Sequence, residues 1–145
     1  MDQNPIILLV EDNPNDITLT LHAFEKSRIA NKIVVVQDGQ EALDYLFGTG
    51  PFAGRDSKSL PEVVLLDLNL PKIDALDVLK RIRAEDTTRR VPVVVLTSSN
   101  EQSDLISSYN LGPNSFIRKP VSFTNFMQAA AQLGLYWLVL NQPVP

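Results

Sequence analysis

The stretch that decides the fold reads Val63-Val64-Leu65-Leu66-Asp67-Leu68-Asn69-Leu70-Pro71. Its aliphatic run ends in a single carboxylate, Asp67, and Pro71 then stops regular structure. A short aliphatic run without polar alternation is typical of a strand buried on both faces, as in parallel sheets. Open parallel sheets bind ligands beyond the carboxyl ends of their strands, so Asp67 is predicted to lie at the functional edge.

Four further aliphatic runs alternate with helical patterns along the chain. Asn13-Pro14, Asp38 and Asp74 are helix start signals, because their side chains can cap a first turn. Five strands alternating with five helices indicate an α/β protein whose parallel sheet is covered on both faces. A flavodoxin-like (βα)5 fold with strand order 2-1-3-4-5 places the first and third strands side by side. The other expected strands cover residues 6–10, 33–36, 91–96 and 116–117, and the last two helices about 101–109 and 123–140.

Composition excludes several classes of function. The chain has 145 residues, which suits one domain, and it has no cysteine, so disulfides, zinc–thiolate sites and a catalytic thiol are excluded. The single histidine, His22, is interpreted as a surface residue and leaves no cluster for an imidazole metal centre. A net charge of -4 argues against a general nucleic-acid surface. No signal segment or apolar run of membrane-spanning length is present, which predicts a cytoplasmic protein without a membrane partner.

Charged and hydroxyl side chains follow four of the predicted strands. Glu11 and Asp12 follow the first strand, Asp67 ends the third, Thr97 the fourth, and Lys119 comes after the fifth. With the first and third strands adjacent, three carboxylates crowd at one site and repel each other unless a cation compensates. A hard divalent ion with oxygen ligands, most plausibly Mg²⁺, meets this requirement.

The same residues suit phosphoryl chemistry. An ionised aspartate beside Mg²⁺ is a workable nucleophile toward phosphorus and gives an aspartyl phosphate. Lys119 and the Thr97 hydroxyl could bind phosphoryl oxygens, since phosphoryl transfer depends mainly on positioning and charge neutralisation. Taken alone, each residue has a plainer role: an aspartate usually caps a helix, a lysine is usually solvated, and Phe116 is as readily a core residue as a functional one.

The ordered set resembles the receiver domain of two-component response regulators. The resemblance rests on Glu11-Asp12, the Leu-Leu-Asp-Leu-Asn-Leu-Pro segment around Asp67, Thr97-Ser98 and Lys119-Pro120. The spacing agrees, with Thr97 thirty positions after Asp67 and Lys119 twenty-two positions further on. The resemblance spans essentially the whole chain. It implies a single receiver domain over residues 1–145 without an output domain, acting as a signalling switch and not as an enzyme beyond its own aspartyl phosphorylation and dephosphorylation.

The resemblance also implies a role for each site residue. Asp67 is the expected phospho-acceptor, with a histidine kinase as donor. Asp12 and Asp67 are expected to bind Mg²⁺ directly with the backbone carbonyl of Asn69, and Glu11 through water. Thr97 and Phe116 match the switch positions, where a hydroxyl turns toward the phosphate and a ring turns inward. The fourth helix, fifth strand and fifth helix are the expected responding surface, which passes the signal to an unknown downstream protein.

A finer resemblance links the chain to the small response regulators of bacterial, cyanobacterial-type phytochromes. It rests on Thr-Gly-Pro-Phe-Ala-Gly-Arg at residues 49–55, Asp-Leu-Asn-Leu-Pro-Lys, Val-Val-Val-Leu-Thr-Ser-Ser, Lys-Pro-Val-Ser-Phe and Tyr136-Trp137. Those proteins are single domains, often dimeric, and act downstream of light-sensing histidine kinases. One departure is Ala75, where most receivers have glycine, and it leaves the local turn in question.

The extended C-terminal helix and tail, residues 123–145, carry more apolar side chains than one buried face needs. The apolar stripe of the expected last helix, which contains Trp137, is widened by Leu135, Tyr136, Leu138 and Val139. A helix end folded against its own domain is one interpretation, and a homodimer interface is the other, which the size of the apolar patch favours.

Two rival functions remain open. A phosphorylation-independent receiver-like binding module would keep the fold and lose the switch. Such a module is expected to lack part of the acidic set, whereas this chain has the whole set. A Mg²⁺-dependent phosphohydrolase could use the same sheet. Such enzymes usually need Asp-x-Asp, and this chain has Asp67-Leu68-Asn69.

Overall fold

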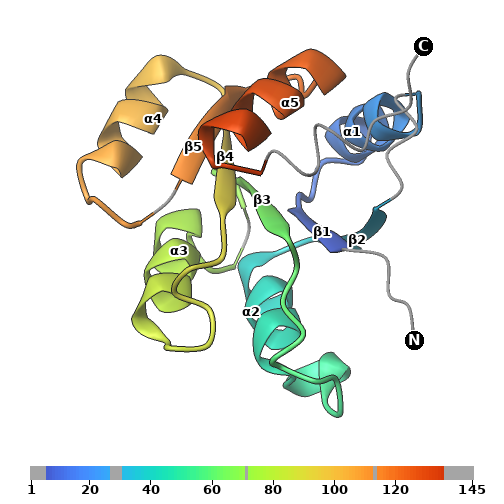
Figure 1. Ribbon diagram of the computed structural model, residues 1–145, viewed down its shortest axis with the longest axis vertical. Helices are drawn as coiled ribbons and strands as arrows, with labels where there is room; N and C mark the ends of the chain where they lie inside the picture. Colours follow the sequence, from blue (N-terminus) through green and yellow to red (C-terminus); the bar gives the residue numbers. More distant parts are fainter. Residues whose placement is uncertain (1–5, 27–30, 71, 113, 136–145) are drawn as a thin grey trace.

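Five parallel strands form one sheet in the computed structural model, which describes residues 6–26, 31–70, 72–112 and 114–135 (Figure 1). The strand order is β2-β1-β3-β4-β5, so the predicted flavodoxin-like topology is confirmed. The strands are β1 (Ile6–Val10), β2 (Lys32–Val36), β3 (Val63–Asp67), β4 (Val93–Thr97) and β5 (Asn114–Arg118).

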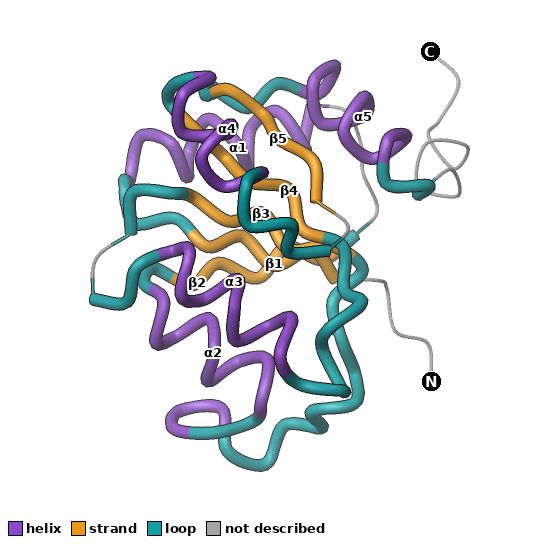
Figure 2. Tube along the Cα trace, turned by 90° about the vertical axis from the view of Figure 1, so that its left-hand side faces the viewer, coloured by secondary structure: helices purple, strands orange, loops and turns teal. Residues whose placement is uncertain are grey.

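Helices cover both faces of this sheet. Apolar side chains of α2, α3 and α4 pack on one face, and those of α1 and α5 pack on the other. Figures 1 and 2 show α2 and α3 on the side of the sheet opposite to α1 and α5. Within the described part of the chain, no helix is both long and apolar enough to cross a bilayer. The helices are α1 (Pro14–Lys26), α2 (Gly39–Phe47), α3 (Ala75–Ala84), α4 (Asn100–Ser107) and α5 (Phe123–Gln132), with a short 3-10 turn, η1 (Gly50–Phe52), after α2.

The central strand β3 is buried on both faces, as its aliphatic run predicts. Val64 and Leu66 pack with the α2 and α3 side, whereas Val63 and Leu65 pack with the α1 and α5 side. Successive side chains of a strand point to opposite faces, so one short run serves both halves of the core. This double burial fixes the register of β3 and therefore the position of Asp67 at its end.

The predicted helix starts are confirmed. The Asn13 side chain accepts from the backbone N–H of Asp16 at 3.1 Å, and the Asp38 side chain accepts from the backbone N–H of Glu41 at 2.8 Å. The Glu41 carboxylate does not return to Asp38 as a capping box requires, but accepts from the backbone N–H of Gln37 at 2.7 Å. The cap therefore also fastens the end of β2 to α2.

The last helix is shorter than predicted, and a continuous helix from Phe123 to Leu140 is wrong. The helix ends at Gln132, because Gly134 takes a left-handed conformation with φ of 78°. The Leu135 N–H then donates back to the Ala130 carbonyl at 2.9 Å, the bond that closes a Schellman motif. Leu135 is buried in the core under α5, so the folded-back interpretation holds for this residue. The other predicted interface residues, from Tyr136 to Val139, lie outside the described residues.

Ala75 fits its position without strain. It is the first residue of α3 and is buried, and the preceding Asp74 side chain accepts from the Leu76 N–H at 3.0 Å to cap the helix. Left-handed backbone occurs nearby at Lys72, with φ of 66°, and not at Ala75. A glycine is therefore unnecessary at position 75. Pro71 itself lies outside the described residues.

Arg83 ties the end of α3 to the segments that lead into β4 and β5. Its Nε donates to the Leu111 carbonyl at 2.6 Å, and its two Nη atoms donate to the carbonyls of Arg89 and Val91 and to Oδ1 of Asn114. Burial lowers the pKa of the Arg83 guanidinium to about 10. A planar guanidinium satisfies several acceptors at once, which a lysine ammonium cannot do in the same geometry.

We predict that Arg83→Lys lowers the free energy of unfolding by about 1–3 kcal/mol, because buried carbonyl acceptors lose their donors. Urea denaturation followed by circular dichroism measures the change. Arg90→Lys is the matched control, since Arg90 is exposed, and we expect a change below about 0.5 kcal/mol there. Equal stability of the two variants would contradict the role of Arg83.

Candidate functional site

The register of the sheet brings the predicted acidic residues together. In the β1–β3 pair Val10 lies opposite Leu66, so the next residues, Glu11 and Asp67, lie side by side at the carboxyl edge. The backbone of β1 continues its pairing at this point, with the Glu11 N–H donating to the Val36 carbonyl at 3.0 Å. Parallel strands that end together thus present their last side chains to one place.

Three carboxylates form a compact cluster at this edge. Oxygen atoms of Glu11, Asp12 and Asp67 lie within 4.8 Å of one another. Glu11 and Asp67 are buried, at 0% and 1% exposure, and Asp12 is exposed to solvent. An all-oxygen donor set with one open side fits a hard divalent cation such as Mg²⁺.

Lys119 reaches this cluster from the end of β5, where its N–H donates to the Thr97 carbonyl at 2.9 Å. Its Nζ lies 3.0 Å from Asp67 Oδ1, 3.0 Å from Asp16 Oδ2 and 3.4 Å from Glu11 Oε1. Burial alone lowers the pKa of the ammonium, but hydrogen bonds and the negative charges of these carboxylates outweigh burial and raise it. Lys119 therefore remains a cation in contact with Asp67.

Glu11 holds its proton unusually tightly. Burial, followed by a hydrogen bond and the negative charge of Asp67, raises the pKa of Glu11 from 4.5 to about 7. The Asn13 N–H and the Lys119 ammonium act in the opposite direction but are smaller effects. A nearby divalent cation favours the ionised carboxylate, so cation binding and ionisation of Glu11 favour each other.

Asp16 is a site residue that the sequence patterns did not reveal. It lies in the first turn of α1, where an acidic side chain is expected simply to complement the helix dipole. Its contact with Lys119 joins residues 103 positions apart. The sequence could have indicated this residue only by its position, in a helix that begins just after Glu11 and Asp12.

The remaining predicted residues surround this centre. The Asn69 N–H donates to Asp67 Oδ1 at 3.2 Å, which turns the loop after β3 around the carboxylate. The Thr97 hydroxyl donates to the Ser99 carbonyl at 2.6 Å and accepts from the Ser99 N–H at 3.0 Å. Phe116 is half-buried against the core side formed by α2 and α3, away from these polar contacts. His22 is exposed, as predicted.

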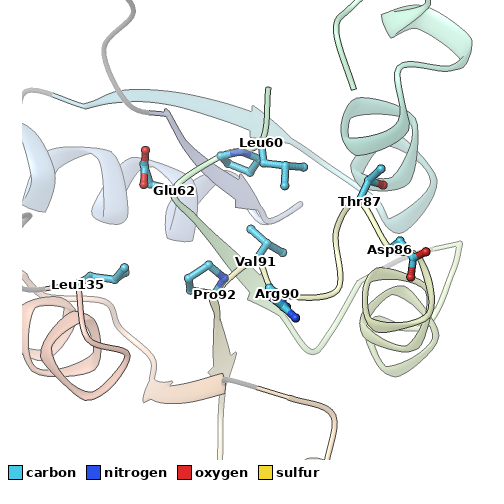
Figure 3. A pocket seen from close by; sticks show the side chains of 9 residues that line it. Leu60, Glu62, Asp86, Thr87, Arg90, Val91, Pro92 and Leu135 are labelled. Atoms are coloured by element: carbon cyan, nitrogen blue, oxygen red, sulfur yellow. The ribbon is translucent and has the colours of Figure 1, made fainter. Parts of the chain in front are cut away.

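A separate hollow of about 320 Å³ lies at the amino ends of β3 and β4 (Figure 3). These ends are opposite to the edge that carries Asp67, so the hollow is no part of the acidic cluster. Five apolar and four polar or charged residues line it. The lining residues are Leu60, Pro61, Glu62, Asp86, Thr87, Arg90, Val91, Pro92 and Leu135.

Comparison with known families supports the resemblance that the site residues suggested. The sequence matches the family model of the response regulator receiver domain over residues 7–131. This chain belongs to that family. The match covers β1 to α5 and includes the acidic cluster, Thr97 and Lys119.

Two curated relatives are similar to this receiver domain over most of their own length. The probable methanogenesis regulatory protein FilR2 of Methanothrix harundinacea is 41% identical over 94% of this chain and 86% of its own. The response regulator Rcp1 of Synechocystis sp. is 34% identical over 94% of this chain and 92% of its own.

Solved structures show the same relation. The bacteriophytochrome response regulator AtBRR is 52% identical with a TM-score of 0.89, over 97% of this chain and 100% of that one. The phosphorylated cyanobacterial phytochrome response regulator RcpA is 37% identical (TM-score 0.73, covering 98% of both chains). The Mn(2+)-bound form of Rcp1 is 33% identical (TM-score 0.73, covering 97% and 99%). The chain is thus a receiver domain homologous to phytochrome response regulators, as its motifs predicted.

We predict that the pKa of Glu11 makes the receiver less stable as pH rises in the absence of metal. Between its unfolded pKa of 4.5 and about 7, the folded protein keeps a proton that the unfolded chain has lost. Stability from this group is therefore full below about pH 4.5 and is lost as pH rises through 7, by on the order of 2 kcal/mol.

Unfolding in urea with EDTA, measured from pH 5 to 8, tests this expectation. Glu11→Gln should flatten the fall in stability, and Glu101→Gln, an exposed residue of α4, should keep it. A Glu11→Gln variant with the same pH dependence as wild type would show that another group is responsible.

Proposed function

We propose that this receiver is a phospho-accepting signalling switch in which Asp67 takes a phosphoryl group from a histidine kinase. The observation that carries the proposal is the buried Asp67 carboxylate, 3.0 Å from the Lys119 ammonium and clustered with two further acids. A buried carboxylate that contacts a cation and clusters with acids suited to a divalent ion has the features of an activated nucleophile.

In the proposed reaction, a carboxylate oxygen of Asp67 forms a bond to phosphorus. The bond from phosphorus to the imidazole nitrogen of the kinase breaks, and that nitrogen keeps the electron pair. Lys119 then donates to a phosphoryl oxygen and offsets the charge that arrives with the group. The Asn69 N–H, bonded to Asp67 Oδ1, holds the carboxylate in a fixed orientation.

We propose Mg²⁺ as the ion of this site. Asp12, Asp67 and the Asn69 backbone carbonyl would bind it directly, and Glu11 through water. The ion supplies charge neutralisation for the phosphoryl group. The proposal is supported by the oxygen-only cluster within 4.8 Å and by the binding of a divalent ion in the similar Rcp1 structure.

Thr97 and Phe116 are the proposed switch residues. The Thr97 hydroxyl bonds to Ser99 and must release that carbonyl before it can donate to a phosphoryl oxygen. Phe116 is half-buried, so an inward turn would bury its ring further. Phosphorylation would thus be a local change of charge that biases two arrangements of α4, β5 and α5.

The proposed kinase is a light sensor of the phytochrome type, by similarity to the bacteriophytochrome regulator AtBRR and to RcpA. The output would pass to a separate downstream protein, because the described residues form a receiver domain alone. A non-enzymatic role and a cytoplasmic location remain predictions from the sequence.

We predict that Asp67→Asn abolishes phosphorylation and that Lys119→Ala keeps the fold but uncouples phosphorylation from activation. The first variant lacks the nucleophile, and the second lacks the cation that senses the new charge. Incubation with acetyl phosphate, with and without Mg²⁺, followed by intact mass measurement, detects one added phosphate. Asp104→Asn, an exposed aspartate of α4, is the matched control and should react like wild type.

Two results would count against the proposal. Acid-labile phosphate on Asp67→Asn at the wild-type rate would mean that the site is misassigned. No uptake by wild type under any condition would favour the phosphorylation-independent binding module. Release of inorganic phosphate from added monoesters would instead favour the hydrolase, which the asparagine at position 69 makes the weaker alternative.

We further propose that the protein is a homodimer held by the apolar residues near its C-terminus. Light scattering after size exclusion at about 50 µM should give close to twice the chain mass of 16.1 kDa. Trp137→Glu should shift the mass toward the monomer because a charge is costly in an apolar interface, and Gln142→Glu should not. A monomeric wild type, or a dimeric Trp137→Glu, would contradict this arrangement.

A further inference from the structure

Asp16 contacts Lys119 as closely as the proposed phospho-acceptor does. The distance from Nζ to Asp16 Oδ2 is 3.0 Å, the same as the distance to Asp67 Oδ1. The two side chains are largely shielded from solvent, with 27% of Asp16 and 16% of Lys119 exposed. This pair links the first turn of α1 to the end of β5, so it is a tertiary contact and not a local one.

A closed set of contacts holds Asp16 in place. The Glu11 carboxylate accepts from the Asn13 N–H at 3.2 Å, and Asn13 Oδ1 accepts from the Asp16 N–H at 3.1 Å. Asp16 then binds Lys119, which returns to Glu11 at 3.4 Å. Asp16 is therefore a positioned group, unlike an exposed carboxylate that pairs with a lysine by chance.

The core anchors the helix that carries this residue. Phe24 of α1 meets Phe126 of α5 edge to face, with ring centroids 4.7 Å apart, and both rings are buried. This packing holds the backbone of Asp16 with α1, so only its short side chain can turn to follow Lys119. A large movement of the ammonium away from α1 therefore stretches or breaks the ion pair.

Asp16 has a different position from the acids that can bind metal. Among the described residues, the cluster with metal-ligand spacing contains Glu11, Asp12 and Asp67 and does not include Asp16. Its described ionic partner is Lys119. The ammonium has three donors, and the three carboxylates around it use all of them. A phosphoryl oxygen must replace one of these contacts.

We propose that Asp16 is a positioning residue that competes with the phosphoryl group for Lys119 and thereby slows phosphorylation of Asp67. The inference rests on the proposed phosphorylation of Asp67. Asp16 draws the ammonium toward α1 and offsets its positive charge, and it adds a negative charge that repels an incoming anionic donor. Whichever contact the phosphoryl oxygen replaces, both effects make the build-up of negative charge at Asp67 less favourable.

The test is the rate of phosphorylation by acetyl phosphate at saturating Mg²⁺, followed by intact mass. Asp16→Asn keeps the size of the side chain and removes its charge, and we expect the rate to rise about three- to tenfold. Asp16→Glu keeps the charge and should stay near the wild-type rate. Glu25→Gln removes the same charge from an exposed position of α1 and should leave the rate unchanged.

A binding measurement separates positioning from a general effect on the fold. The affinity for beryllofluoride, a non-covalent phosphoryl analogue, is measured by calorimetry at saturating Mg²⁺ on the same variants. If Asp16 competes for Lys119, Asp16→Asn should bind the analogue about three- to tenfold more tightly. A purely structural role predicts weaker binding and a lower melting temperature instead.

The outcomes are distinguishable. A faster rate with tighter analogue binding, restored by Asp16→Glu, supports the inference. An unchanged or slower Asp16→Asn, in a protein whose wild type takes up phosphate on Asp67, overturns the inference and leaves the proposed function standing. A wild type that takes up no phosphate overturns the proposed function and this inference with it.

Discussion

The balance of charge at the carboxyl edge of the sheet is the constraint on which the site depends. Three carboxylates, from Glu11, Asp16 and Asp67, contact the Lys119 ammonium, and Asp12 clusters with two of them. Two of the acids are almost completely buried, where an uncompensated charge is costly. The protein reduces this cost by sharing one cation among three acids and by raising the pKa of Glu11. A divalent cation would offset the remaining negative charge, so the acidic cluster favours metal binding.

The core makes this crowding possible. Carboxylates repel each other and would separate on a flexible loop, but here each follows a strand whose register is fixed by burial on both faces. The alternation of Leu65 and Leu66 between the two core halves leaves Asp67 one possible place. Hydrophobic packing therefore stabilises an arrangement that electrostatics alone opposes. Stability and function depend on the same aliphatic runs.

The sequence predicted the features that follow from the order and ends of the strands. It missed contacts that depend on how far individual side chains extend. The fold and the proximity of Glu11, Asp67 and Lys119 follow from which residues end parallel strands. The contact of Asp16 depends on how far two side chains extend between a helix and another strand, which no pattern encodes. The end of α5 was missed for a different reason. The apolar residues after Gly134 suggested a continuing helix, but the left-handed glycine and the returning Leu135 N–H end it.

Two short routes connect the acidic edge to the helices around it. The Thr97 hydroxyl is bonded to Ser99, whose side chain caps α4 by accepting from the Gln102 N–H at 3.2 Å. A Thr97 that turns toward Asp67 therefore gives up a bond at the start of α4. Lys119 reaches α1 through Asp16 in the same way. Each route is one or two polar contacts long and ends at the first turn of a helix, where few backbone bonds hold the chain. Under the proposed phosphorylation, a change of charge at Asp67 would reach the first turns of α1 and α4 through these contacts, while the buried strands that position the site stay in place.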